Sequence, residues 1–261
     1  MPVLFIGHGS PLNLILDNGF TRSLKELGRR LPRPKAILVV SAHWLTEGTC
    51  VGCMDRPKTI HDFSGFPREL YRMAYSSPGA PDEARLVTRL VGKVPVACSE
   101  EWGLDHGAWA ILKHLYPQAD IPAFEMSLDY AFNNRRPKPV QHHYDLAGEL
   151  AELRNRGVLI IGSGNIVHNL SLLDFSNIEA DPVPWAREFG ERVKEGLLSG
   201  NDRSLIQYAG LGPSASLAVP TLDHYLPLIY AVALREKDEP LAFTHEGFQY
   251  GSISMRCFQI G

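Results

Sequence analysis

The chain has 261 residues, of which 44% are hydrophobic and 21% are charged, and its formal net charge is −3. These shares are ordinary for a globular protein and exclude a wholly disordered chain, and the small negative charge gives no reason to expect a nucleic-acid partner. No apolar run approaches the roughly 18 residues that cross a bilayer, and the first residues lack a basic leader and a cleavage site, so we expect a cytoplasmic enzyme.

Predicted strands and helices alternate along the first half of the chain. An apolar run at residues 3–6 predicts a strand that stops at the loop signal Gly7-His8-Gly9-Ser10-Pro11. Residues 36–44 are apolar on both faces, which is typical of a strand buried inside an α/β sheet. The other elements expected here are helices at 20–31, 80–92 and 107–116, strands at 49–54 and 121–128, and a long loop at 55–68.

The second half continues the same alternation. Residues 129–139 are the best candidate for a linker, but a predicted helix at 140–156 runs directly into a buried strand at 158–162. We therefore place no domain boundary and expect one domain over residues 1–261. Helices are expected at 184–198 and 221–235, and the alternating residues 252–260 predict a half-buried strand. The pattern predicts an α/β fold, a single layered domain whose central sheet is mixed, mostly parallel and flanked by helices.

The four cysteines do not make a disulfide framework. Cys50 and Cys53 form a C-x-x-C pair, but they lie on a predicted strand, where residues three apart face opposite sides. This placement favours buried structural thiols over a metal or redox pair.

Three of the ten histidines follow predicted buried strands, namely His8, His43 and His168. Ligands of open α/β sheets bind at the carboxyl ends of the strands. One histidine there is more often a hydrogen-bonded loop residue, but three together favour metal ligands, and His106 and His224 are placed to reach the same cleft. Histidines with or without one carboxylate suit zinc and non-haem Fe(II). We assign the remaining candidates outside the loop at 55–68 to surface or core packing: His114, His142, His143 and His245.

Other catalytic motifs fail on inspection. Gly162-Ser-Gly164 follows a strand, but Val167 stands where a dinucleotide fingerprint needs its third glycine. The chain contains no phosphate-binding loop, no H-E-x-x-H pair and no G-x-S-x-G elbow. A histidine-rich metal site is the chemistry that is left.

Five short motifs then stand together in chain order: Gly7-His8-Gly9-Ser10-Pro11, Ser41-Ala42-His43-Trp44, Asp105-His106-Gly107, the run from Gly162 to Leu170, and His224-Tyr225-Leu226-Pro227. They closely resemble the DOPA 4,5-dioxygenase type of the class III (LigB-like) extradiol ring-cleavage dioxygenases. His61-Asp62-Phe63 and Gly65-Phe66-Pro67 fit the same type. The resemblance runs from residue 3 to Gly261, and the chain looks like a bacterial member of this type.

The resemblance implies a LigB-like catalytic domain that opens a catechol ring and inserts both atoms of O2. It implies Fe(II) as the working metal and Zn(II) in many purified samples. His8 and His43 match metal ligands, and His224 matches the third ligand, where the wider superfamily often has a carboxylate. His168 matches an active-site histidine that acts as an acid and base, or as a fourth ligand when zinc is bound. His106 matches a second catalytic histidine that faces the substrate or oxygen.

A DOPA-like substrate needs partners for its ring, its amine and its carboxylate. The loop at 55–68 offers charged and polar candidates, and aromatic residues offer a wall for the ring; these are Arg56, His61, Asp62 and Arg68, and Trp44, Phe63, Phe66, Trp109 and Tyr225. Of these, we take His61, Asp62, Trp109 and Tyr225 as the substrate-binding candidates. A solvated loop charge or ordinary core packing is the alternative at each position.

Two other functions stay open. A zinc hydrolase would use metal-bound hydroxide as its nucleophile, but no carboxylate general base is apparent near the histidines. A non-catalytic metal-binding module on the same fold is the second alternative, and the retention of His106 and His168 argues against it. We expect a small-molecule catechol and O2 as partners, no nucleic acid, no membrane, and a monomer or small homo-oligomer.

Overall fold

A computed structural model describes residues 1–131 and 136–261. The strands are β1 (Val3–Gly7), β2 (Ala36–Thr46), β3 (Thr49–Gly52), β4 (Val96–Ser99), β5 (Ala123–Ala131), β6 (Arg136–Pro137), β7 (Val158–Gly164), β8 (Leu241–His245), β9 (Phe248–Gln249), β10 (Ile253–Ser254) and β11 (Cys257–Ile260). The α-helices are α1 (Gly19–Arg30), α2 (Pro81–Leu90), α3 (His106–Leu115), α4 (Val140–Gly148), α5 (Ala151–Asn155), α6 (Pro184–Ser199), α7 (Asp202–Ile206), α8 (Ala215–Ala218) and α9 (Leu226–Ala233).

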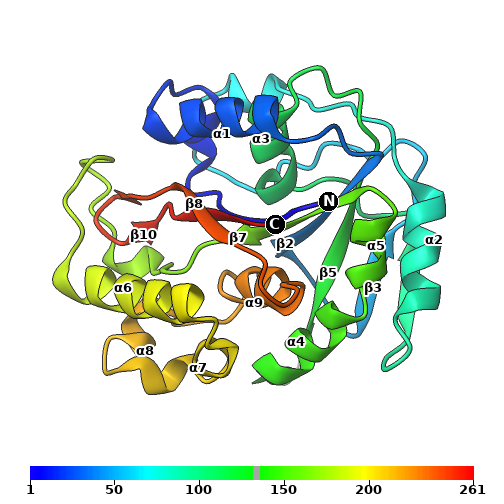
Figure 1. Ribbon diagram of the computed structural model, residues 1–261. Coiled ribbons are helices and arrows are strands. Elements are labelled where there is room, and N and C mark those ends of the chain that lie inside the picture. Colours follow the sequence, from blue (N-terminus) through cyan, green and yellow to red (C-terminus); the bar gives the residue numbers. More distant parts are fainter. Residues whose placement is uncertain (132–135) are drawn as a thin grey trace.

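One large mixed sheet runs through the middle of the molecule (Figure 1). Its strands lie in the order β4-β3-β5-β2-β7-β1-β11-β8, and β6 pairs with β5. The four central strands β5, β2, β7 and β1 are parallel to one another, whereas β11 and β8 are antiparallel to their neighbours. This arrangement confirms the expected fold class and puts the carboxyl ends of β1, β2 and β7 at one edge.

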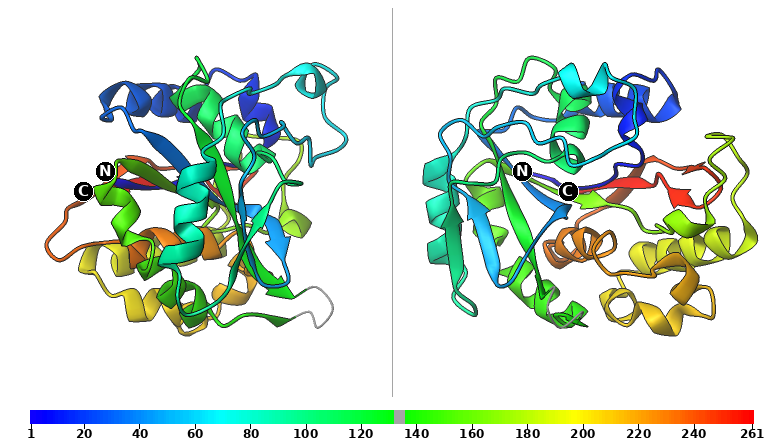
Figure 2. Two further views of the ribbon diagram at one scale, coloured as in Figure 1. Left: turned by 90° about the vertical axis from the view of Figure 1, so that its right-hand side faces the viewer. Right: turned by 180° about the vertical axis from the view of Figure 1, so that it is seen from behind.

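Helices cover both faces of the sheet. Figure 2 shows α1 and α3 on one side and the group from α4 to α9 on the other. Successive residues of β1 alternate between the two layers, so Leu4 and Ile6 pack toward α1 and α3 while Val3 and Phe5 pack toward the other side. Among the helices of the described residues, none is long and apolar enough to cross a membrane.

Several observed elements differ from the predicted ones in their bounds. The helix expected at 140–156 is divided into α4 and α5, and the helix expected at 221–235 begins only at Leu226. The final strand is buried on both faces rather than half-buried, because β11 lies between β1 and β8 with helices above and below it. Of the candidate linker at 129–139, the first three residues belong to β5, and residues 132–135 lie outside the described residues.

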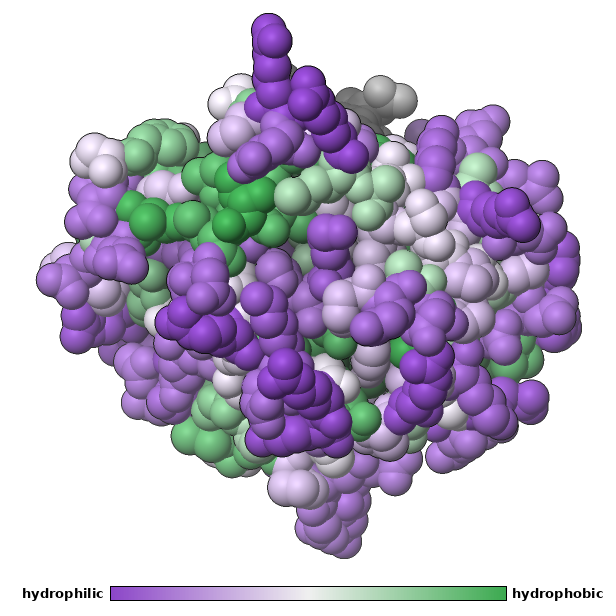
Figure 3. Space-filling model, turned by 90° about the horizontal axis from the view of Figure 1, so that it is seen from above, coloured by the Kyte–Doolittle hydropathy of each residue, from purple (hydrophilic) through white to green (hydrophobic). Residues whose placement is uncertain are grey.

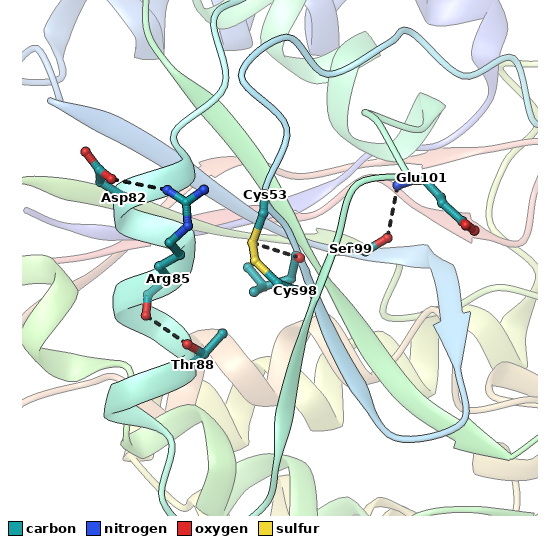
Figure 4. Close-up of a disulfide and its surroundings, with 8 residues drawn as sticks. Cys53, Asp82, Arg85, Thr88, Cys98, Ser99 and Glu101 are labelled. Carbon is teal, nitrogen blue, oxygen red and sulfur yellow. Dashed lines mark hydrogen bonds and ion pairs between the residues drawn. A yellow bond between two sulfur atoms is a disulfide. The ribbon is translucent and has the colours of Figure 1, made fainter.

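The expectation of free buried thiols is wrong for Cys53. Figure 4 shows Cys53 joined to Cys98 by a disulfide beside α2, with the two Cα atoms 5.7 Å apart. Cys98 lies on β4, an exposed edge strand that the apolar pattern did not reveal. Cys50 is a free, half-buried thiol.

Two glycines of β7 let the chain before and within α9 approach the sheet closely. A Cβ atom at Gly162 would lie 2.2 Å from the Pro227 carbonyl oxygen, and one at Gly164 would lie 2.2 Å from the His224 carbonyl oxygen. The backbone N–H of Asn165 donates to the same His224 oxygen over 2.9 Å. The absence of side chains at these positions therefore fixes where His224 stands.

We expect Gly162→Ala to lower the free energy of unfolding by about 1–3 kcal/mol, because the added methyl group meets backbone that cannot move freely. Urea denaturation of purified protein measures the change. Gly148→Ala is the matched control, since a Cβ at Gly148 meets no atom within 4 Å. An equal loss of stability in both variants would contradict the close-approach explanation.

Candidate metal centre and its cavity

Five histidine side chains meet at the carboxyl edge of the parallel strands. They are His8, directly after β1; His43, within β2; His106, the first residue of α3; His168, after β7; and His224, two residues before α9. The ring centroids of the closest pairs outside the His168–His224 stack are 4.0–5.3 Å apart. The pairing of β2 with β5 shifts between Val40 and Leu45, in the stretch that carries His43, and such irregularities re-aim side chains.

The hydrogen bonds of His8 assign its tautomer. Its Nδ1 lies 3.0 Å from the Ser163 hydroxyl, and that hydroxyl donates its only proton to the Gly107 carbonyl over 2.6 Å. Ser163 must therefore accept from His8, so the proton is on Nδ1 and the Nε2 atom of His8 carries a lone pair.

Asp62 does the same for two further rings. One carboxylate oxygen lies 2.8 Å from Nδ1 of His106 and 3.4 Å from Nδ1 of His43, and the other accepts the backbone N–H of His106 over 2.8 Å. Burial works to raise the pKa of Asp62, but the hydrogen bonds from His106 outweigh it and hold the pKa below its usual range. An ionised carboxylate only accepts, so His106 keeps its proton on Nδ1 and presents Nε2 as a lone pair. The Nδ1 atom of His43 lies near the same oxygen without a hydrogen bond, and this negative charge favours the same tautomer for His43.

His224 is oriented by its sequence neighbour and stacked on His168. Its Nδ1 lies 2.5 Å from the Asp223 carboxylate; burial works against ionisation of Asp223, but this hydrogen bond lowers its pKa to about 2. The rings of His168 and His224 lie parallel, with centroids 3.4 Å apart and planes 5° apart. Burial first, and then the charge that His224 can carry, lower the pKa of His168 to about 2, so its ring is neutral.

With these tautomers, ring nitrogen lone pairs converge on one place, where a cation would bind. The Nε2 atoms of His8 and His43 face each other at 3.1 Å, each with a lone pair. Burial and the neighbouring histidines lower the pKa of both rings well below its usual range, which opposes a bridging proton. One ring nitrogen from each of His8, His43 and His106 lies within 4.8 Å of the other two. Buried neutral imidazoles with converging lone pairs fit a divalent metal ion.

The metal ligands expected from the sequence are His8, His43 and His224, with His168 as a fourth. The structure brings all four together, and it also brings the ring of His106 to 4.0 Å from that of His43. His106 is thus a geometric alternative to His224 as third ligand.

The histidines form the inner end of a cavity of about 680 Å³. Its outer part is lined by apolar side chains from two segments, one around Phe63 and Phe66 and the other around Leu170, Leu173 and Phe175. Figure 3 shows hydrophobic residues gathered on the left of the molecule seen from above, the side on which the segment after β7 lies in Figure 1.

The four substrate-binding candidates separate into one that lines this cavity and three that do not. Asp62 lines it, with its carboxylate already engaged. His61 approaches the Met73 carbonyl with Nε2 at 2.9 Å, and the fully buried Trp109 donates to the Ile60 carbonyl, so both hold the Asp62 loop in place. Tyr225 is fully buried and donates to a carbonyl of α7.

Two carboxylates do lie beside the histidines, since Asp62 and Asp223 each contact a histidine ring, but both are engaged by these rings and neither is a free general base. Asp223 is adjacent in sequence to His224 and signals this contact, whereas the position of Asp62 depends on the path of a long loop. A buried hydrogen-bond network that the sequence did not reveal holds the start of α3, where His106 lies. Asp105 caps α3, accepts from the Ser41 hydroxyl over 2.8 Å and donates its backbone N–H to Glu125 over 2.7 Å.

Comparisons with known proteins identify the family of the chain. The family model described as the catalytic LigB subunit of aromatic ring-opening dioxygenase matches residues 3–256. The chain is 43% identical to the 4,5-DOPA dioxygenase extradiol of Escherichia coli K12, over 100% of this chain and 95% of that protein. It is 35% identical to the Beta vulgaris protein of the same name, over 98% of this chain and 94% of that one. A crystal structure of an uncharacterized E. coli K12 protein superposes with a TM-score of 0.85 at 39% identity, covering 100% of both chains.

We expect Asp62→Asn to weaken Zn²⁺ binding by about 10–100-fold, because loss of a partner that orients metal-binding imidazoles typically has this effect. An asparagine has one acceptor oxygen, so it cannot accept both the backbone N–H and the ring N–H of His106 as the two carboxylate oxygens do. Competition with a chromophoric chelator measures the affinity. Asp145→Asn, on the exposed face of α4, is the control, and equal affinities in the two variants would contradict the role of Asp62.

Proposed function

Because the chain belongs to the LigB family of aromatic ring-opening dioxygenases, we propose that this extradiol dioxygenase opens a catechol ring and that Fe(II) is its working metal. The observation that carries the proposal is the pair of facing Nε2 lone pairs on His8 and His43, with further imidazoles around them. A small aromatic substrate and O2 follow from the family. A DOPA-like catechol is suggested by the names of the E. coli and Beta vulgaris relatives.

We assign the metal to His8, His43 and His224, with His168 beside them. Three neutral imidazoles leave the full double charge of the ion in place, which favours binding of an anionic catecholate. Ferrous iron held there would supply binding positions for the catechol oxygens and O2, and a redox-active centre through which electrons of the catechol, the group that is oxidised, could pass to O2. The same three nitrogens suit zinc, which binds such sites more tightly than ferrous iron and is redox-inert, so we expect purified protein to hold inactive zinc.

His106 is placed to take a proton from a catechol hydroxyl. Its Nδ1–H donates to Asp62, so its Nε2 is a free acceptor, and the carboxylate stabilises the imidazolium that forms when Nε2 is protonated. The backbone N–H of His106 donates to the same carboxylate, which fixes the ring relative to its own helix. His168 also lines the cavity, with its ring stacked on that of His224, and is our second acid and base.

The zinc-hydrolase alternative is not strengthened by the carboxylate that the structure reveals. Asp62 already accepts from the backbone and ring of His106 and lies beside the ring of His43, so it is engaged as an orienting group. A general base for water would need a free acceptor position toward the metal. The cytoplasmic location and the monomeric or small oligomeric state stay predictions.

Metal-free protein loaded anaerobically with Fe(II) should consume O2 and form a yellow ring-opened product when a catechol is added. Protein loaded with Zn(II) should do neither. Oxygen uptake and absorbance in parallel samples test both statements. Turnover of the zinc form, or hydrolysis of an ester panel by it, would contradict the dioxygenase assignment.

Separate substitutions of His224 and His106 should distinguish the metal ligand from the general base. We expect His224→Ala to weaken Zn²⁺ binding beyond the about 10–100-fold that loss of an orienting partner causes. We expect His106→Ala to keep the metal and to lose about 10²–10⁴-fold in kcat, the range for a general base. Chelator competition and O2 uptake provide the two measurements. Loss of metal in His106→Ala with retention in His224→Ala would exchange the two roles.

A further inference from the structure

The Cys53–Cys98 disulfide joins two chain segments at the point where both leave the sheet. The first segment, residues 54–62, follows Cys53 at the end of β3, and the second segment, residues 99–106, follows Cys98 on β4. Because β3 and β4 are paired in parallel, the two segments leave the sheet in the same direction. Figure 4 shows the disulfide at their common base, beside α2.

Backbone hydrogen bonds hold the two segments side by side. At the base, the N–H of Cys53 donates to the Ser99 carbonyl over 2.8 Å. Further along, the N–H of Leu104 donates to the Lys58 carbonyl and the N–H of Ile60 donates to the Leu104 carbonyl, each over 2.8 Å. The two segments therefore run together from the disulfide toward the histidine site.

The two segments end at the contact that orients His106. One oxygen of Asp62, the last residue of the first segment, accepts the backbone N–H of His106, and the other accepts its Nδ1–H, both over 2.8 Å. A hydrogen bond of this kind weakens beyond about 3.2 Å, so a shift of about 0.5 Å between the segments is enough to weaken it. The alignment of the segments therefore decides how well Asp62 holds the ring.

The sheet alone anchors the base of the second segment weakly. β4 has four residues, lies at the edge of the sheet and is paired with β3 alone among the described strands. Beyond β4, Glu125 ties the second segment to β5, because its carboxylate accepts from the Trp102 ring and from the backbone N–H of Asp105. Glu125 holds one segment only, whereas the disulfide is the covalent tie between the two.

We propose that Cys53 and Cys98 are positioning residues: their disulfide aligns the two segments so that Asp62 holds His106, and reduction of the disulfide loosens this contact while the fold is retained. The consequence for turnover rests on the proposed function, in which His106 is a base. The consequence for the metal site does not, because Asp62 orients the imidazoles whichever reaction follows.

Reduction by a small dithiol is the chemical step that breaks the tie. The dithiol gives two electrons and two protons to the S–S bond, which becomes the thiols of Cys53 and Cys98, and the dithiol itself is oxidised to a cyclic disulfide. Cys98 is exposed whereas Cys53 is buried, so a thiolate in solution has access to the bond from the Cys98 side.

The first experiment compares oxidised protein, protein reduced with dithiothreitol and then desalted without air, and Cys98→Ser. We expect Zn²⁺ affinity, measured by chelator competition, to fall by at least about threefold and up to about tenfold in the last two, the lower end of the range for loss of an orienting partner. We expect kcat of the iron-loaded protein to fall by about threefold to 100-fold, since a displacement of about 1 Å costs about 100-fold. Oxidised glutathione should restore the reduced protein and leave Cys98→Ser unchanged.

Cys50→Ser is the matched control, because Cys50 is a free, half-buried thiol on β3 and the substitution leaves the disulfide in place. It should match the oxidised protein in both measurements. Circular dichroism before and after reduction shows whether the fold is retained. Zn²⁺ affinity and kcat that stay within about twofold on reduction would overturn the inference, and so would loss of the fold.

A second experiment separates positioning from general stabilisation. A disulfide ordinarily stabilises a protein by restricting its unfolded chain, and that effect would not single out Asp62. If the disulfide acts through Asp62, Cys98→Ser should change Zn²⁺ affinity and kcat by less than about twofold in a protein that already carries Asp62→Asn. Equal losses in the two backgrounds would contradict the positioning role.

Failure of this inference is distinguishable from failure of the proposed function. If iron-loaded protein opens catechols equally well with and without the disulfide, only the positioning role is wrong. If no catechol is opened in either state, the proposed function is wrong, and Zn²⁺ affinity still decides whether the disulfide aligns Asp62.

Discussion

A neutral imidazole can offer a lone pair at one nitrogen only if its other nitrogen holds the proton, and the site depends on this constraint. The Nδ1–H groups of His8, His106 and His224 donate hydrogen bonds to Ser163, Asp62 and Asp223. The Nδ1 atom of His43 lies 3.4 Å from the same Asp62 oxygen. Each acceptor is forced into that role, the carboxylates because they are ionised and Ser163 because its hydroxyl proton is already bound to Gly107. The partners of the ring nitrogens thus decide that four Nε2 atoms are free to bind.

The sheet makes this arrangement rigid at the edge where it is needed. His8 follows β1 and Ser163 lies on β7, and the two strands are paired in parallel with Gly7 opposite Gly164. The glycines of β7 then admit the backbone around His224 to contact distance. Burial that makes a charged histidine unfavourable also makes the neutral, metal-binding form the stable one, so packing and ligand chemistry act in the same direction.

The histidines were predictable because strand ends can be read from apolar runs, and parallel strands bring their ends together. That is why His8, His43 and His168 could be grouped from the sequence. Asp62 and Cys98 were not placed, because one lies on a long loop and the other on a short, exposed edge strand, and neither has a periodic apolar pattern. Tyr225 shows a second limit of sequence-based prediction. An aromatic residue next to a candidate ligand gives the same sequence pattern whether its ring lines a cavity or packs in the core, and Tyr225 is fully buried in the core.

The two ends of the cavity are built in different ways, and this bears on how substrate choice relates to family membership. The histidine end rests on strands, on glycines that contact backbone and on hydrogen bonds that fix tautomers, so most changes there would disturb the metal site. The apolar end rests on exposed side chains of irregular segments, where Leu170 and Phe175 have few constraints from packing. Loops on a rigid scaffold commonly carry specificity in this way. Similarity over the whole chain therefore supports the ring-opening chemistry more strongly than it identifies the substrate, because exposed residues at the outer end of the cavity can change without loss of the fold or of the histidine cluster.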